Sequence, residues 1–382
     1  MSVTREHVLR YRWRAQQLDR APGEVDVADL AVLDLGIQSC GRDSVASSLV
    51  DRGITLTEAV AATDGTDDSL ALVWAVRGAP HFHRRSDLAD LATALSPFDA
   101  ADAYKRLAGT GGTWKKAGVD PIRALAALGA QMRAALDEPR VKGALSSALH
   151  GQIPAEYEVD CRPCGSTHPA EMAFRVAALH AGIELVPGTS PPVLRSIPTW
   201  PTDREIGPAP DPSAVPPRLD QVRAYLRLIG PATPADVAAY LDTSATVVKR
   251  VWPDDAAEVD RVGTSASILE GDRDALTAAT ESGEKSVRLL SPCDLFTAAR
   301  DRTVLLDRAH HKAVWPAIGR PGVVARDGEI LGIWRPSKKG KCLTVSVDAW
   351  APLDDWTRQQ IGDRADILAA SRGCSSAHVE GV

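Results

Sequence analysis

Apolar positions along the chain repeat at helical spacing, then change to the two-residue spacing of strands, and this succession occurs several times. The first succession predicts helices over residues 5–18, 25–35, 44–52 and 57–63, the second ended by Gly36 and the last capped by Thr57. The next segment, LALVWAVRGAPHFHRR, has the β-branched and aromatic residues of a hairpin. A winged helix has this order of elements, with helices followed by a hairpin.

The same order recurs twice. The second succession starts at Asp120-Pro121 and contains the helices IRALAALGAQMRAAL, VKGALSSALHG and PAEMAFRVAALHAG, followed by the extended segment IELVPG. The third contains the helices RLDQVRAYLRLIG, TPADVAAYLD and SATVVKRVW, followed by EVDRVGTSASILEG as its wing. The proline-rich stretch between them predicts a linker.

After Ser291, short helices precede two strands that the basic turn KKGK joins. The patterns together predict an α+β, mainly α protein with three tandem winged-helix units and a C-terminal β-rich segment. The predicted boundaries are 1–118, 119–200 and 217–290 for the units, 201–216 for the linker and 291–382 for the β-rich segment with its basic hairpin.

Composition is that of a globular protein of several modules, with 382 residues, 44% hydrophobic and 25% charged. No apolar run approaches the roughly 20 residues that a membrane-spanning helix needs, and the N-terminal segment is charged. We therefore expect a cytoplasmic protein without a membrane partner. The six cysteines are scattered, which favours thiols over a disulfide framework.

A net charge of −6 excludes a uniformly basic protein that coats nucleic acid, so DNA contacts have to come from local clusters. In the third unit, Lys249 and Arg250 lie on the helix expected to face DNA, and the alternative is a unit used only for packing or protein contact. The lysines of the KKGK turn either enter a DNA groove or keep the turn soluble. The residues predicted to contact DNA are Arg77, His81, His83, Arg84, Lys249, Arg250, Arg300, Arg302, Lys338, Lys339 and Lys341.

Motifs for other chemistries are absent from the sequence. It has no P-loop, no Gly-x-Gly-x-x-Gly after a strand, no Gly-x-Ser-x-Gly and no His-Glu-x-x-His, so nucleotide-driven, hydride-transfer, serine-hydrolase and zincin reactions lack support. The segment CRPCGSTH offers Cys161, Cys164 and His168 as soft metal ligands, or it forms a structural turn that caps the next helix. Because a second CxxC pair is missing, we predict the turn, with no metal and no cofactor.

Five stretches together resemble one family, the AlkZ-like winged-helix DNA glycosylases. They are LDLGIQSC, LVWAVRGAPHFH, RAYLRLIGPATPADVAAYLD, SPCDLFTAARDRTVLL and HKAVWPAIGRPGVVARDGEILGIW. The resemblance implies tandem winged helices that form a curved channel for duplex DNA. It also implies hydrolysis of the N-glycosidic bond of alkylated purines, including bulky or crosslinked N7-guanine adducts.

The resemblance further implies a catalytic motif of glutamine, an apolar residue, and then glutamine or aspartate, which here reads Gln38-Ser39-Cys40. Gln38 matches the family, whereas Cys40 lacks the strong acceptor expected at the third position. Asp43 either supplies the missing carboxylate in a shifted register or caps the next helix. The alternatives for Gln38 and Cys40 are a buried amide that ties the chain locally and an unreactive buried thiol.

The family pattern also has a histidine at the place of His81, which implies a residue lining the channel. His81 and His83 are two positions apart on a predicted strand and so share a face, and the alternative is a pair of surface histidines. The sequence therefore predicts a monomeric glycosylase that binds double-stranded DNA and needs no nucleotide cofactor. The alternative is a non-enzymatic DNA-binding protein, such as a regulator or lesion sensor, in which Cys40 marks the loss of catalysis.

Overall fold

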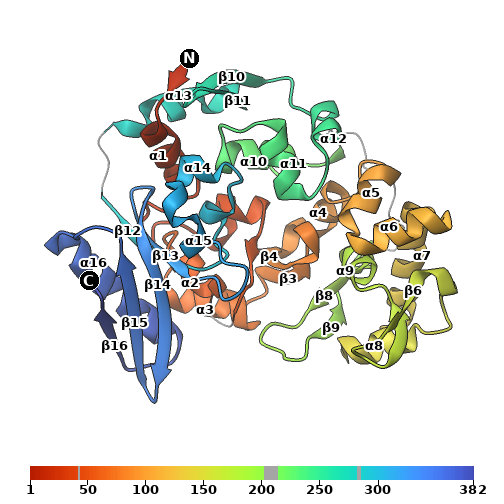
Figure 1. The fold of residues 1–382 in the computed structure, drawn as a ribbon. Coiled ribbons are helices and arrows are strands. Elements are labelled where there is room, and N and C mark those ends of the chain that lie inside the picture. Colours follow the sequence, from red (N-terminus) through yellow and green to blue (C-terminus); the bar gives the residue numbers. More distant parts are fainter. Residues whose placement is uncertain (42–43, 202–213, 282–284) are drawn as a thin grey trace.

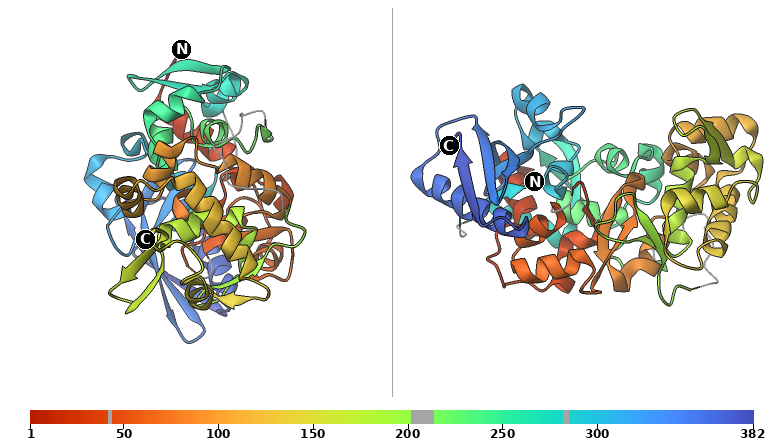
Figure 2. Two further views of the ribbon diagram at one scale, coloured as in Figure 1. Left: turned by 90° about the vertical axis from the view of Figure 1, so that its right-hand side faces the viewer. Right: turned by 90° about the horizontal axis from the view of Figure 1, so that it is seen from below.

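The structure, a computed structural model, describes residues 1–41, 44–201, 214–281 and 285–382. Over these residues the protein is of the α+β class, with 16 α-helices and four β-sheets (Figure 1). It is elongated, with the C-terminal sheet at one end and the segment that contains α7 (Pro121–Ala134) and α8 (Lys142–Ala148) at the other (Figure 2). None of the described helices is both long and apolar enough to cross a membrane.

The N-terminal helices precede a hairpin, in the predicted order. They are α1 (Arg5–Ala15), α2 (Ser44–Val50) and α3 (Leu56–Asp64), and the hairpin pairs β3 (Leu70–Trp74) with β4 (Pro80–Arg84). Helix α3 begins at Leu56, one residue earlier than predicted. Its cap is Thr55 rather than Thr57, because the Thr55 hydroxyl accepts from the Glu58 amide and the Glu58 carboxylate accepts from the Thr55 amide.

The helix predicted over residues 25–35 is wrong. The chain instead forms two 3-10 turns, Val27–Asp29 and Ala31–Asp34, separated by the extended backbone of Leu30. Leu30, Val32, Leu33 and Leu35 are all fully buried, so the apolar side chains of this segment do not lie on one face as in an amphipathic helix. The apolar spacing in this segment thus reflects a chain enclosed by the core, not an amphipathic face.

A six-stranded sheet runs through the middle of the molecule, in the order β2-β4-β3-β8-β9-β5. Beside the hairpin it contains β2 (Ile37–Gln38), β5 (Arg140–Val141), β8 (Ile183–Leu185) and β9 (Val193–Ser196). One sheet therefore joins strands from both sides of residue 118. The remaining helices of this region are α4 (Leu88–Ala94), α5 (Ala100–Arg106), α6 (Gly109–Ala117) and α9 (Glu171–His180).

The third region follows its predicted pattern closely, because each helix carries its own cap. Helices α10 (Gln221–Ile229), α11 (Pro234–Leu241) and α12 (Ala245–Arg250) are capped by Asp220, Thr233 and Ser244. The hairpin of β10 (Ala256–Arg261) and β11 (Thr264–Leu269) comes next, and β1 (Ser2–Val3) pairs with β10. Helix α13 (Arg273–Thr277) completes the region. Most of the preceding proline-rich stretch lies outside the described residues.

The C-terminal region is a five-stranded sheet with one helix on its face. Two short helices, α14 (Arg302–Leu305) and α15 (His311–Val314), connect β12 to the rest of the sheet. Its strands are β12 (Val287–Leu290), β13 (Gly322–Arg326), β14 (Glu329–Lys339), β15 (Cys342–Ala349) and β16 (Ser376–Glu380). Helix α16 (Asp355–Ser371), which the β-rich prediction did not include, buries Ile361, Ala365 and Leu368 against the sheet.

Candidate functional site

Gln38 lies on β2, the edge strand of the central sheet, directly opposite His81 on β4. Cross-strand partners of this kind have neighbouring side chains on one face of a sheet. The Gln38 side chain is half-buried, and among the described residues its amide has no hydrogen-bond partner. It does not tie the chain to a local turn, and its carbonyl oxygen and amide group are available to a bound molecule or to water.

Gly36 allows this strand to approach β4. Its φ of +81° is in the left-handed region, and a Cβ at this position would lie 2.3 Å from the Nε2 atom of His83. The His83 ring therefore packs directly on the glycine backbone, two residues before Gln38. Any larger residue at position 36 would displace either the ring or β2.

His81 and His83 are buried, so the alternative of surface histidines is wrong. Their ring centroids are 6.2 Å apart. The Nδ1 atom of His81 lies 2.9 Å from the Ala79 carbonyl oxygen, and the Nδ1 atom of His83 lies 3.0 Å from that of Leu33. Burial is the main cause that lowers the pKa of His81 to about 3 and that of His83 to about 4. Both rings are neutral at pH 7, each with Nδ1 as the donor, and the role of His81 in lining a channel stays a prediction.

These buried rings predict a loss of stability in mild acid. Burial also lowers the pKa of His180 to about 4, so three histidines stay neutral in the folded state while their unfolded pKa is about 6.5. Between pH 6.5 and 4 the unfolded chain binds more protons, and the free energy of unfolding falls as the pH falls. We expect a loss of roughly 1–2 kcal/mol per histidine between pH 6.5 and 5. Urea midpoints measured at pH 7 and pH 5 check this, and equal midpoints would contradict it.

Cys40 lies at the mouth of a surface cavity of about 460 Å³, which Ser44, Arg320 and Trp334 also line. The Cys40 backbone amide donates to the Ser44 hydroxyl at 3.1 Å. Its thiol is next to that of Cys293, and a hydrogen bond from Cys293 lowers the pKa of Cys40 while the pKa of Cys293 rises. Cys40 is exposed, so the alternative of a buried thiol is wrong, while a catalytic role for it stays a prediction. Asp43, the third predicted catalytic residue, lies outside the described residues.

Cys293 is held in place by a buried ion pair one residue away. Both oxygens of Asp294 accept from the guanidinium of Arg52, each at 2.8 Å, and both side chains are 1% exposed. The hydroxyl of Ser48, on α2, donates to the same carboxylate at 3.1 Å. The segment before η9 (Leu295–Ala298) is thereby fixed to α2, the helix that follows Cys40 in the chain.

The charges of four arginines act on one another, on His81 or on Cys40, and we call them the arginine cluster: Arg77, Arg300, Arg302 and Arg320. None of them forms an ion pair among the described residues. The pKa of Arg300 is lowered mainly by burial and further by the charges of Arg77 and Arg302. The pKa of Arg320 is also lowered mainly by burial, and the charge of Arg302 adds to this effect. The positive charge of Arg77 contributes to the low pKa of His81, and that of Arg320 to the low pKa of Cys40.

The guanidinium groups of the cluster contact aromatic rings and oxygen atoms of neutral groups instead of carboxylates. Arg77 lies over the ring of Tyr240 with its Cζ 5.0 Å from the centroid, and Arg302 lies over Trp315 at 4.7 Å. Arg320 donates to the carbonyl and hydroxyl oxygens of Thr297 at 3.2 and 3.0 Å.

Asp301, the carboxylate between Arg300 and Arg302 in the sequence, does not neutralise the cluster. It is buried and accepts from Arg12 at 2.6 Å and from Arg261 at 2.8 Å. Two other arginines therefore share its charge. The same ion pairs fix the backbone from which Arg300 and Arg302 project, so the cluster keeps a net positive charge on a rigid base.

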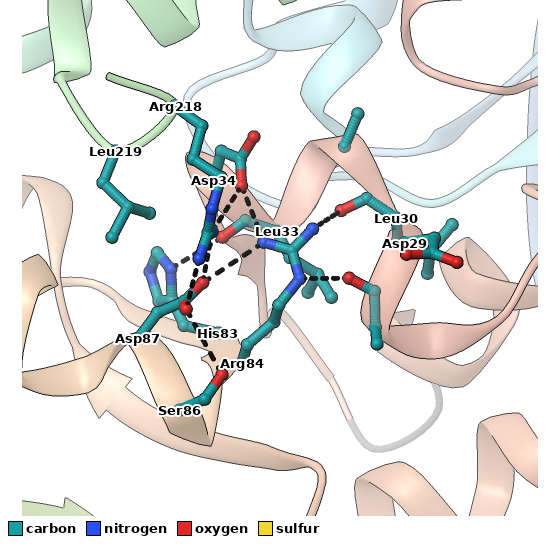
Figure 3. Close-up of polar contacts among 12 residues, drawn as sticks. Asp29, Leu30, Leu33, Asp34, His83, Arg84, Ser86, Asp87, Arg218 and Leu219 are labelled. Atoms are coloured by element: carbon teal, nitrogen blue, oxygen red, sulfur yellow. Dashed lines mark hydrogen bonds and ion pairs between the residues drawn. The ribbon is translucent and has the colours of Figure 1, made fainter. Parts of the chain in front are cut away.

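Arg84 has a different environment from the arginine cluster (Figure 3). Its guanidinium donates to Asp34 at 2.6 Å and to Asp87 at 3.3 Å, and it also contacts the carbonyl oxygens of Ala28 and Leu30. Arg218 donates to both oxygens of Asp87 at 2.6 Å. Arg84 thus serves within the fold to join β4 to the 3-10 turns, and its predicted DNA contact would require breaking these bonds.

The other predicted DNA contacts lie on separate surfaces. Lys249 and Arg250 end α12, where Lys249 is exposed and Arg250 pairs with Asp99 at 2.5 Å. Lys338, Lys339 and Lys341 are exposed at the β14–β15 turn, with the Lys338 ammonium 2.8 Å from the Arg372 carbonyl oxygen. The structure therefore brings Arg77, Arg300 and Arg302 together, and the two lysine groups remain apart from them.

Two residues of the site, Cys293 and Arg320, were missed in the sequence. Both lie within the C-terminal stretches SPCDLF and AIGRPG, which carry the family resemblance, but neither belongs to a local motif. Only folding brings positions 40, 293 and 320 together.

The sequence model for the family described as DNA glycosylase AlkZ-like matches residues 27–371, which is most of the chain. The protein therefore belongs to the AlkZ-like family of DNA glycosylases, and the resemblance inferred from the sequence is confirmed. Its structure is similar to that of the Streptomyces sahachiroi DNA glycosylase AlkZ, with a TM-score of 0.72 and 22% sequence identity over 100% of both chains. This likeness shows a common fold. Comparison with curated proteins finds no match.

Proposed function

We propose that the protein hydrolyses the N-glycosidic bond of alkylated purines in duplex DNA, with N7-alkylguanine as the substrate class and bulky or crosslinked adducts included. The observation that carries the proposal is the arginine cluster, whose charges act on Cys40 and on His81, the cross-strand partner of Gln38. The half-buried side chain of Gln38 has no hydrogen-bond partner among the described residues. The proposal assigns phosphate binding to the cluster and contact with the damaged nucleotide to Gln38.

The charge of the cluster supports a polyanionic partner. Burial is the main cause that lowers the pKa values of Arg300 and Arg320, and the like charges of other arginines lower them further. A phosphate group would relieve this repulsion and accept charge-assisted hydrogen bonds from the guanidinium forks. The cluster therefore fits the DNA backbone at the point where a lesion would face Gln38.

Release of an N7-alkylated guanine requires little acid catalysis from the protein. A guanine alkylated at N7 is cationic, so when the bond from the sugar C1′ to N9 breaks, the bonding electrons neutralise the base and the base leaves readily. Water adds to C1′ and loses a proton. The Gln38 carbonyl oxygen would orient that water or stabilise the charge that develops on the sugar, and Asp43 keeps its predicted role of supplying a carboxylate in a shifted register.

The wider architecture that we propose follows from the order of the elements. Helices α10–α12 and the hairpin β10–β11 would act as a winged helix, with Lys249 at a DNA phosphate. Residues 1–118 and 119–200 would form the other two winged-helix units of a curved channel that ends at the lysines of the β14–β15 turn. An open channel would admit adducts too large to be flipped into an enclosed pocket.

One observation favours the second candidate, a lesion-binding protein without catalytic activity. Cys40 stands where the family resemblance implies glutamine or aspartate, and its partner is the Cys293 thiol rather than a strong acceptor. This candidate keeps the DNA-binding role of the arginine cluster and removes base release.

A base-release assay separates the two candidates. The protein is incubated with a duplex that carries one N7-methylguanine, and heating in alkali then converts each abasic site into a strand break. We expect scission well above that of a heated blank and of the undamaged duplex. Binding to the damaged duplex without scission would reject the glycosylase and support the lesion-binding protein.

A further inference from the structure

A two-stranded hairpin at the far end of the molecule from the C-terminal sheet brings three soft ligands together. Strands β6 (Glu158–Cys161) and β7 (Ser166–Pro169) pair so that Cys161 lies opposite Ser166, while Cys164 lies in the turn and His168 opposite Val159. The two Sγ atoms and one ring nitrogen of His168 all lie within 4.8 Å of one another. Over the described part of the chain, this is the one group of three histidine, cysteine or acidic side chains that meets this condition.

We propose that the hairpin β6–β7 binds a zinc ion through Cys161, Cys164 and His168. Zinc–sulfur bonds of about 2.3 Å and zinc–nitrogen bonds of about 2.0 Å place the ligand atoms of a tetrahedral site roughly 3.3–3.8 Å apart. The observed spread therefore needs only small side-chain rotations. The sequence predicted a turn without metal because a second CxxC pair is missing, but the pairing of β6 with β7 brings His168 within reach of both thiols.

The orientation of His168 supports the site. Its Nδ1 atom lies 2.8 Å from the Pro169 carbonyl oxygen, which fixes the proton on Nδ1 and leaves the lone pair of Nε2 free. A ligating histidine ordinarily donates its other N–H to such a carbonyl group.

The turn between the cysteines has the backbone that such a site needs. Gly165 has a φ of +63°, in the left-handed region, and its amide donates to the Cys161 carbonyl oxygen at 2.8 Å. This closes the loop that brings Cys164 back toward Cys161. The geometry depends on a glycine directly after the second cysteine.

The hairpin also buries few side chains. It is a separate two-stranded sheet, and of its eight strand residues only Pro169 is buried. A two-stranded hairpin is marginally stable on its own in water, so a metal clamp at the turn would order it. Glu171, an acidic side chain whose charge acts on Cys164, is already bound by Lys142 at 2.6 Å and Arg175 at 2.7 Å. We therefore assign the fourth position to water.

The inference is independent of base release, because it is tested by metal content. Full-length protein is expressed with zinc, dialysed under reducing conditions and measured by mass spectrometry of the metal. We expect about one zinc per chain, as for a structural site, and almost none in the Cys161→Ser/Cys164→Ser double variant. Cys374→Ser removes a half-buried cysteine outside the hairpin and should leave the metal content unchanged.

Cobalt gives a second readout. Replacement of zinc by cobalt should produce the visible absorption of a tetrahedral cobalt–thiolate site, which His168→Ala should weaken or shift. Chelation should then increase hydrogen exchange at residues 158–169 and leave the central sheet unchanged. If the reduced wild-type protein holds no more zinc or cobalt than the double variant, with both folded by circular dichroism, the site does not bind metal and the proposal fails.

Discussion

Replacing Gln38 by alanine is expected to lower the rate of base release by about 100-fold or more, the usual cost of removing one group that acts in the transition state. The side chain projects from a short edge strand, is half-buried and has no hydrogen-bond partner among the described residues, so its removal breaks no hydrogen bond among them. The fold and the DNA affinity should therefore change little. Single-turnover rates at saturating protein measure the chemical step apart from binding.

Two control variants make this test specific. Gln359→Ala removes the same side chain from an exposed position on α16 and should leave the rate unchanged. Arg302→Gln removes an exposed member of the arginine cluster, so it should weaken binding and reduce the salt dependence of the affinity by about one phosphate contact, with little effect on the saturated rate. Base release that persists undiminished in Gln38→Ala would reject the assignment of that residue.

Replacing Asp294 by alanine is expected to destabilise the protein by about 3–5 kcal/mol, because it leaves the buried charge of Arg52 without its partner. Arg52 and Asp294 make two hydrogen bonds of 2.8 Å with both side chains 1% exposed. The variant should also loosen the segment that holds Cys293 beside Cys40. Urea unfolding followed by circular dichroism measures the stability.

The matched control is Asp355→Ala, which breaks the exposed pair of Asp355 and Arg358 on α16 and should have little effect. Replacing both Arg52 and Asp294 by apolar residues of similar volume should cost less than Asp294→Ala alone, since no buried charge remains unpaired. A stability of Asp294→Ala equal to that of the wild type would show that the ion pair does not anchor this segment.

The same ion pair makes the free energy of unfolding depend on pH. Burial opposes the charge of Asp294, but Arg52 outweighs it and lowers the pKa of Asp294 below its ordinary value. Its contribution to stability is therefore complete above the unfolded pKa, near 4, and is lost as the pH falls through the lower folded value. The losses that the buried histidines cause begin higher, below pH 6.5, so the two effects separate along a titration.

Much of the local structure was predictable, because its signals lie within a few residues of one another. Asp220, Thr233 and Ser244 cap α10, α11 and α12 as single side chains placed before apolar helical spacing. The β14–β15 turn was predictable from Gly340 between alternating strands. The helix predicted over residues 25–35 failed because its apolar residues are enclosed on all sides, which a linear pattern does not distinguish from an amphipathic face.

The candidate site was predictable only in part. Gln38, Arg77, Arg300 and Arg302 stood out in the stretches that resemble the family, but that resemblance carried no information on which charges are neutralised. Arg84 and Arg302 cannot be told apart in the sequence. In the structure Arg84 donates to Asp34 and Asp87, whereas Arg302 lies over the ring of Trp315 and forms no ion pair among the described residues. His81 and His83 alternate on a strand, yet both faces of that strand are covered and the rings are neutral.

The sequence by itself determined much of the order of helices and hairpins, the caps of α11 and α12, and the resemblance to a DNA glycosylase family. The tertiary structure decided which arginines lack a carboxylate partner, that Cys40 meets Cys293, and that His168 reaches the two cysteines of the β6–β7 turn. The physical reason is that caps and turns depend on backbone groups a few residues away, whereas burial and charge depend on whatever the folded chain brings within a few ångströms.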